Sequence, residues 1–159
     1  MNILVAGIGN IFQGDDAFGC EVVKRLVSCA LPEGVRLFDF GIRGLDLTYA
    51  LMDDPDLAIL IDAAPGGEIP GTLYLIQPAL SEETPEMLEP HGMNPLQVLQ
   101  AARALGARPR RVLIVGCEPG DLGGEDGRMG LTAPVAAAIH TAAEMVCDLI
   151  KNALVEVPV

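Results

Sequence analysis

Residues 3–19 read ILVAGIGNIFQGDDAFG, and this stretch decides the fold. It opens with a short apolar run that ends in glycine, which is typical of a strand buried on both faces of a sheet. A glycine-containing turn follows, and residues 17–29 then show a helical pattern. Strand, turn and helix in this order predict the first unit of a doubly wound α/β sheet.

The rest of the chain alternates between short runs rich in Val, Ile and Leu and longer helical patterns. Parallel strands are predicted at residues 35–39, 57–62 and 112–117, and an antiparallel hairpin strand is predicted at residues 72–76 after a Pro-Gly turn. Helices are predicted at about residues 45–52, 95–105 and 134–153. The third of the four predicted helices has the clearest ends, because Asn94 suits the N-cap, Pro95 the first helical position and Gly106 the stop.

Composition and charge narrow the class of protein. The 159 residues fit one domain, residues 1–159, and the 22 acidic against 10 basic residues give a net charge of −12, which disfavours nucleic acid as a partner. We expect a cytoplasmic location and no membrane insertion, since the start lacks a signal peptide and no apolar run approaches roughly 18 residues. The four cysteines are scattered without a C-x-x-C pair, which argues against a disulfide scaffold or zinc knuckle.

Acidic residues gather where the predicted strands end. Ligands bind an open parallel sheet outside the carboxyl ends of its strands, and Asp39, Asp62 and Glu118 lie at or just after such ends. Asp15 and Asp16 precede the first helix, where one of them is expected to be an N-cap. We assign to Asp16 the carboxylate that faces the crevice.

Asp62 and His91 join Asp16 as candidate site residues. Asp62 ends a strongly apolar strand, where a carboxylate is costly unless it is coordinated or accepts hydrogen bonds from loop amides. His91 lies in a loop, and no apolar periodicity accounts for it, whereas His140 falls inside the last helix and is expected to be a packed or surface residue. Two carboxylates and one imidazole suit a divalent first-row metal. From the residues alone, this constellation indicates a metal-dependent hydrolase or a metal-recognising protein.

Two other chemistries fit the sequence less well. A dinucleotide-binding G-x-G-x-x-G turn requires glycine where Phe12 stands. Neither serine lies in a G-x-S-x-G elbow, and no cysteine lies beside a histidine in the sequence.

Several motifs closely resemble those of the nickel-iron hydrogenase maturation proteases. They are residues 7–10 (GIGN), 15–19 (DDAFG), 61–63 (IDA), 91–93 (HGM) and 115–119 (VGCEP), in the family's order and over nearly the whole chain. The resemblance implies a three-layer α/β/α sandwich, phosphorylase/hydrolase-like, around a twisted and mostly parallel sheet of about five strands with one antiparallel edge strand. It also implies that Asp16, Asp62 and His91 recognise the metal and carry the catalysis.

The activity implied by the resemblance is an endopeptidase that removes a short C-terminal extension from the hydrogenase large-subunit precursor after nickel insertion. The nickel would be supplied by the precursor, with no permanently bound metal in the protease. The segment with Asp39, Gly41 and Arg43 departs from the family's Asp-Gly-Gly-Thr and is expected to be a substrate loop. Two alternatives remain open: a broader metal-dependent peptidase or amidase, and a non-catalytic nickel sensor or escort protein.

Overall fold

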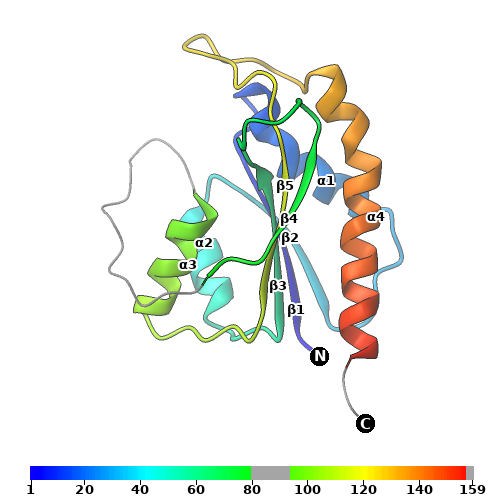
Figure 1. Cartoon of the computed structure of the whole chain (residues 1–159). Coiled ribbons are helices and arrows are strands. Elements are labelled where there is room, and N and C mark those ends of the chain that lie inside the picture. The colour runs from blue at the N-terminus through cyan, green and yellow to red at the C-terminus, as the bar shows by residue number, and fades with distance from the viewer. Residues whose placement is uncertain (80–93, 157–159) are drawn as a thin grey trace.

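A five-stranded sheet forms the middle layer of the fold, in a computed structural model that describes residues 1–79 and 94–156 (Figure 1). The strands are β1 (Ile3–Ile8), β2 (Val35–Gly41), β3 (Leu57–Ala63), β4 (Leu73–Ile76) and β5 (Val112–Cys117), in the order β2-β1-β3-β5-β4. Strands β2, β1, β3 and β5 are parallel, and β4 runs antiparallel to β5 at one edge.

Helices cover both faces of the sheet (Figure 1). One face carries α1 (Phe18–Val27) and α4 (Ala133–Val155), and the other carries α2 (Gly44–Leu51) and α3 (Pro95–Ala104). The protein is therefore the three-layer α/β/α sandwich that the resemblance implied. Among the described residues, α4 alone is long and apolar enough to span a membrane by length and composition, and one of its sides packs into the core with α1.

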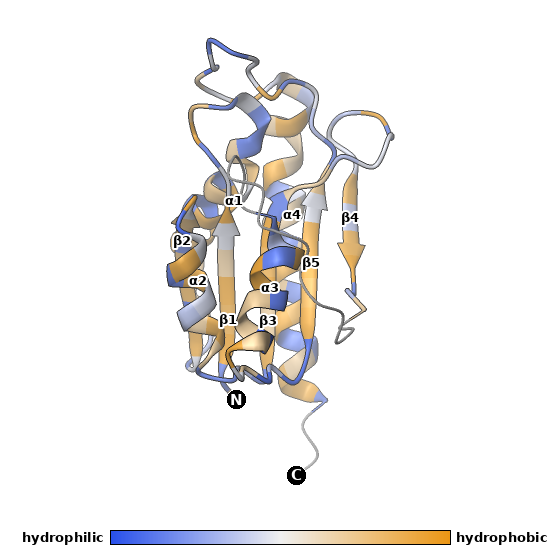
Figure 2. Cartoon of the chain, turned by 90° about the vertical axis from the view of Figure 1, so that its left-hand side faces the viewer, coloured by the Kyte–Doolittle hydropathy of each residue, from blue (hydrophilic) through white to orange (hydrophobic). Residues whose placement is uncertain are grey.

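The central strands are buried on both faces, so their side chains alternate between two cores. Ile3, Val5 and Ile59 belong to the core beneath α1 and α4, whereas Leu4 and Leu60 belong to the core beneath α2 and α3. This is why each strand is a continuous apolar run instead of an alternating pattern. Figure 2 shows the hydrophobic colour extending along β1, β3 and β5, with hydrophilic segments in the turns beyond them.

The predicted elements are confirmed apart from small shifts at their ends and one pairing. Strand β4 is antiparallel as predicted, but it is not the hairpin partner of the strand before it. It pairs with β5, in the register Leu73↔Cys117 to Ile76↔Ile114, and α3 lies between the two strands in the sequence. The Pro-Gly turn therefore reverses the chain without joining neighbouring strands.

The cysteines are all free thiols. Cys20 and Cys117 are buried, as expected for small hydrophobic residues, whereas Cys29 and Cys147 are only partly buried.

The strand order reverses between β1 and β3. The first crossover from β1 leads to β2 on one side, and the next leads to β3 on the other side of β1. Such a switch point opens a crevice at the carboxyl ends of the two strands, which is the usual ligand site of an open α/β sheet.

Glycine lets helix α1 lie unusually close to this crevice. A Cβ atom on Gly19 would lie 2.3 Å from the carbonyl oxygen of Ile8 and 2.1 Å from that of Ile61. The backbone of α1 therefore contacts β1 and β3 directly at this point, and the short segment before α1 is held above the ends of both strands.

Candidate active site

Asp62 lies near the carboxyl end of β3, on the same face of the sheet as Leu60. Its side chain is only 6% exposed, and its Oδ1 atom has no hydrogen-bond partner among the described residues. Burial raises the pKa of Asp62 well above its ordinary value, and the nearby negative charge of Asp16 raises it further. The alternative, hydrogen bonds from loop amides, holds in part: the backbone of Ala63 bonds the carboxylate, whereas Oδ1 has no partner in the part of the chain that the structure describes. Asp62 is an acid kept buried at a cost in stability.

Asp16 lies at the same switch point, in the segment that follows β1. It lies in the 3-10 helix η1 (Gly14–Ala17) after β1, partly buried, and its Oδ2 accepts a 2.9 Å hydrogen bond from the backbone N–H of Asn10. Burial raises the pKa of Asp16 despite this hydrogen bond. Gly9 permits the approach, since a Cβ atom there would lie 1.8 Å from the carbonyl oxygen of Asp16. The structure therefore places Asp16 near enough to Asp62, at the switch point, for its charge to act on that carboxyl, and the assignment of the two as site residues stays a prediction.

Asp15 has a structural role, and the prediction that one of the two neighbouring aspartates caps the first helix is wrong. Neither η1 nor α1 has a side-chain hydrogen bond at its N-cap. The Asp15 carboxylate instead accepts backbone N–H bonds from Gly120 (2.7 Å), Asp121 (3.0 Å) and Thr132 (2.7 Å), and a 2.8 Å bond from the Thr132 hydroxyl. Burial opposes ionisation, but these hydrogen bonds outweigh it and lower the pKa of Asp15. Asp15 thus ties the glycine-rich loop, residues 118–132, to the turn that carries Asp16.

Glu118 fixes the loop that follows Asp62. Its carboxylate accepts hydrogen bonds from the N–H groups of Gly66 (2.6 Å) and Gly67 (3.1 Å) and from the Tyr74 hydroxyl (2.8 Å). The backbone bond from Gly66 contributes most to a lowered pKa of Glu118. Its place just after a buried strand marked it as a polar residue at the sheet edge, but the sequence did not reveal that its partners lie about fifty residues earlier.

The predicted substrate loop lies at the same edge of the sheet, beside β1. The backbone N–H of Gly9 donates to the carbonyl oxygen of Gly41 (3.0 Å), and the N–H of Gly41 donates to Asp39 Oδ1 (2.9 Å). Arg43 donates to the carbonyl oxygens of Asp39 and Phe40 and to the Asp46 carboxylate. Asp39 and Arg43 are thus engaged within their own loop, and their contact with substrate stays a prediction.

The remaining predicted site residue, His91, lies outside the described residues. Within residues 1–79 and 94–156, no group of three His, Cys, Asp or Glu side chains is arranged to hold a metal ion. The two carboxylates at the switch point therefore form an incomplete ligand set, which one further donor would extend. His140 is not that donor, because it is exposed on α4 and contacts Arg25 and Glu144 there.

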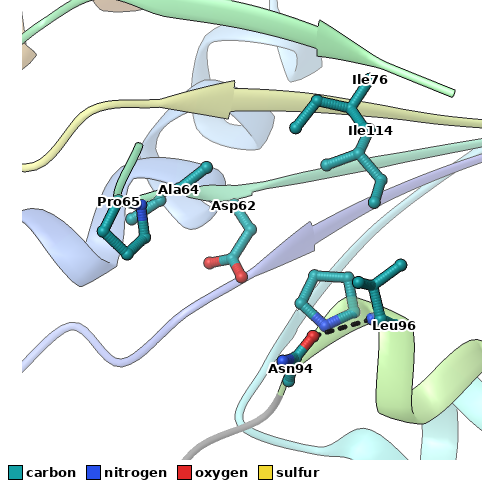
Figure 3. A pocket seen from close by; sticks show the side chains of 9 residues that line it. Asp62, Ala64, Pro65, Ile76, Asn94, Leu96 and Ile114 are labelled. Carbon is teal, nitrogen blue, oxygen red and sulfur yellow. Dashed lines mark hydrogen bonds between the residues drawn. The ribbon is translucent and has the colours of Figure 1, made fainter. Parts of the chain in front are cut away.

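A cavity of about 440 Å³ opens beside Asp62 (Figure 3). Asp62 lines it together with Ala63, Ala64, Pro65, Ile76, Asn94, Pro95, Leu96 and Ile114. Figure 3 shows the Asp62 carboxylate directed between the strand residues and the first turn of α3. No motif in the sequence predicts this cavity, because its lining comes from four separate segments.

Comparisons with known proteins agree over most of the chain. A sequence model of the hydrogenase maturation protease family matches residues 20–149. The hydrogenase expression/formation protein HupD of Bradyrhizobium diazoefficiens is 34% identical over 156 residues, which cover 94% of this chain and 78% of that protein. The hydrogenase 2 maturation protease of Escherichia coli is 32% identical over 161 residues, which cover 98% and 94%. The solved structure of the hydrogenase maturating endopeptidase HybD from E. coli matches with a TM-score of 0.80 at 32% identity, covering 96% of this chain and 94% of that one.

Proposed function

The chain belongs to the hydrogenase maturation protease family, and from this premise we propose that it removes a C-terminal extension from the large-subunit precursor of a nickel-iron hydrogenase after nickel insertion. Family membership confirms the resemblance found in the motifs and supports an endopeptidase that acts in hydrogenase maturation. The proposal adds the bond that is cut, the partner and the requirement for nickel.

One observation carries the proposal: at the switch point, a buried carboxylate with an oxygen that has no partner among the described residues lies near enough to a second carboxylate to be affected by its charge. Asp62 and Asp16 repel each other and are poorly solvated, so both charges are unfavourable in the protein alone. A divalent cation would neutralise the pair and release protons on binding. Nickel held in the precursor is therefore a suitable trigger for cleavage, because the repulsion between the two carboxylates is removed only when the nickel-loaded substrate binds.

The third donor in this scheme is His91, which would complete a set of two oxygens and one nitrogen with open positions. Nickel is then part of the substrate, and the protease needs no metal of its own. The captured ion would polarise the scissile carbonyl or lower the pKa of a bound water molecule, and Asp16 would accept the proton.

The experiment incubates the purified protein with nickel-loaded and nickel-free precursor from the same source and reads the C-terminal mass by mass spectrometry. We expect a short peptide to be lost from the loaded form alone. Asp16→Asn, Asp62→Asn and His91→Gln should each abolish cleavage, whereas His140→Gln, a matched change on the surface of α4, should leave it intact.

Other outcomes discriminate between the alternatives. An unchanged mass with stable complex formation would indicate an escort or sensor protein. Cleavage of nickel-free precursor or of unrelated peptides at a similar rate would indicate a broader peptidase. Full activity of the Asp16→Asn variant would exclude the assigned proton transfer.

A further inference from the structure

We infer that Cys29 and Cys147 form an oxidisable dithiol, which hydrogen peroxide converts into a disulfide that ties the end of α1 to α4. The proposed function assigns no role to these two cysteines. They pack on the face of the sheet that carries α1 and α4, whereas Asp62 lies on the other face, with Leu60 (Figure 1). The inference therefore stands whether or not the protein cleaves a hydrogenase precursor.

The two thiols meet between the helices. Cys29 directly follows Ser28, the C-cap of α1, and Cys147 lies in the second half of α4. Both are partly buried and pack against the core beneath these helices. A hydrogen bond joins the two side chains, so their sulfur atoms are neighbours although the residues are far apart in the sequence. Cys29 lies beyond the end of α1, and its backbone can therefore adjust when an S–S bond forms.

A surface cavity of about 370 Å³ gives access to the pair. Arg25 donates a 3.0 Å hydrogen bond to Nδ1 of His140 there, which holds the last turn of α1 beside α4. Besides the two cysteines, the cavity is lined by exposed polar and charged side chains, namely Arg25, His140, Glu144, Asp148 and Lys151. A small uncharged oxidant such as hydrogen peroxide can therefore reach the sulfur atoms from solvent.

The other two cysteines have different surroundings. Cys20 and Cys117 are each 1% exposed. Burial is the largest of the effects that raise the pKa of Cys117 to about 11. Thiols that are inaccessible and hard to ionise react slowly with oxidants, so Cys20 and Cys117 serve as internal controls in the same chain.

The oxidation is balanced by the two oxygen atoms of the peroxide. The thiolate of Cys29 attacks one oxygen, the O–O bond breaks and hydroxide leaves, so that Cys29 becomes a sulfenic acid. The sulfur of Cys147 then attacks that of Cys29, the S–O bond breaks and the S–S bond forms. Two thiols are oxidised, the peroxide is reduced to two water molecules, and these take up the two thiol protons. The first step falls to Cys29 because burial, and then Cys29 itself, raise the pKa of Cys147.

The first test counts free thiols. The reduced full chain is treated with a small molar excess of hydrogen peroxide, unfolded and labelled with N-ethylmaleimide, and its intact mass is measured. We expect four labels before oxidation and two afterwards, on Cys20 and Cys117, with a Cys29–Cys147 link in the peptide map that dithiothreitol reverses. Four labels after oxidation, a link between two chains, or a sulfinic acid on Cys29 beside a free Cys147 would overturn the inference.

The second test asks whether the link ties the two helices. The oxidised wild type should unfold at a Tm about 5 °C or more above that of the reduced form, because the disulfide closes a long loop of the unfolded chain. Cys29→Ser and Cys147→Ser should each abolish both the link and the rise in Tm. The matched control Ser28→Ala, one residue before Cys29, should keep both. An equal or lower Tm after oxidation of the wild type, or a rise in Tm that persists in either cysteine variant, would contradict the inference.

Discussion

Replacing Asp62 by asparagine should make the protein more stable at neutral pH while it removes cleavage. In the wild type, the ionised carboxylate is buried, is only partly hydrogen-bonded and lies near Asp16. Asparagine has almost the same shape and carries no charge, so both the desolvation cost of the carboxylate and its repulsion by Asp16 disappear.

The size of the gain follows from two opposing contributions. Each unit by which the pKa of Asp62 exceeds its ordinary value costs about 1.4 kcal/mol once the carboxyl is ionised. The asparagine amide remains poorly partnered in the same place, which offsets part of the gain by about 1–3 kcal/mol. We expect a net increase of about 1–2 kcal/mol in the free energy of unfolding at pH 8, or about 2–8 °C in Tm for a domain of this size.

The pH dependence of this gain in stability shows whether the buried charge of Asp62 is its cause. Below the ordinary value of 3.8, Asp62 is protonated in both the folded and the unfolded chain, so the charge contributes no difference between variant and wild type. As pH rises from 3.8 to the raised pKa of Asp62, ionisation of this carboxyl lowers stability in the wild type but not in the variant, so the advantage of the variant grows and then levels off. Thermal unfolding at pH 4, 6 and 8 measures this, with Asp126→Asn, in the exposed glycine-rich loop, as a control expected to change stability by less than about 0.5 kcal/mol. A gain equal at pH 4 and pH 8, or a loss at pH 8, would refute the reasoning.

Two further substitutions test the supports of the site. Asp15→Ala removes an acceptor shared by three backbone N–H groups and the Thr132 hydroxyl, and should lower the free energy of unfolding by about 3 kcal/mol or more in urea titrations, with faster proteolysis of the glycine-rich loop; unchanged stability would contradict the role assigned to Asp15. Gly19→Ala places a methyl group against the carbonyl oxygens of Ile8 and Ile61 and should cost about 1–3 kcal/mol or more, measured in the same way; a variant as stable as the wild type would show that α1 can move away from the strands.

Most of the fold could be predicted because the central strands and α3 carry strong local signals. Runs such as residues 57–61 are apolar without interruption since both faces of the sheet are covered, and the N-cap Asn94 bonds the N–H of Leu96 as its position predicted. The partner of β4 could not be predicted, because pairing with β5 depends on where α3 returns the chain and not on the turn before β4.

The sequence predicted that the candidate site contains acids at the ends of strands. It did not predict which of these acids fix loops and which face the site. Asp15 and Asp16 are adjacent and chemically identical, and only the folded position of the glycine-rich loop decides which one receives its amides. The cavity beside Asp62 could not be predicted either, because residues on β3, β4, β5 and α3, which are far apart in the sequence, line it together.

The four buried or partly buried acids at this edge therefore fall into two pairs by their surroundings. Asp15 and Glu118 accept several short hydrogen bonds, have lowered pKa values and fix loops, whereas Asp16 and Asp62 have raised pKa values, and Asp62 Oδ1 has no partner among the described residues. Burial opposes ionisation in all four, so hydrogen bonding decides the difference. Asp15 and Glu118 stabilise the loops beside the other pair, and it is to Asp16 and Asp62 that the proposed function assigns a cation delivered by a partner.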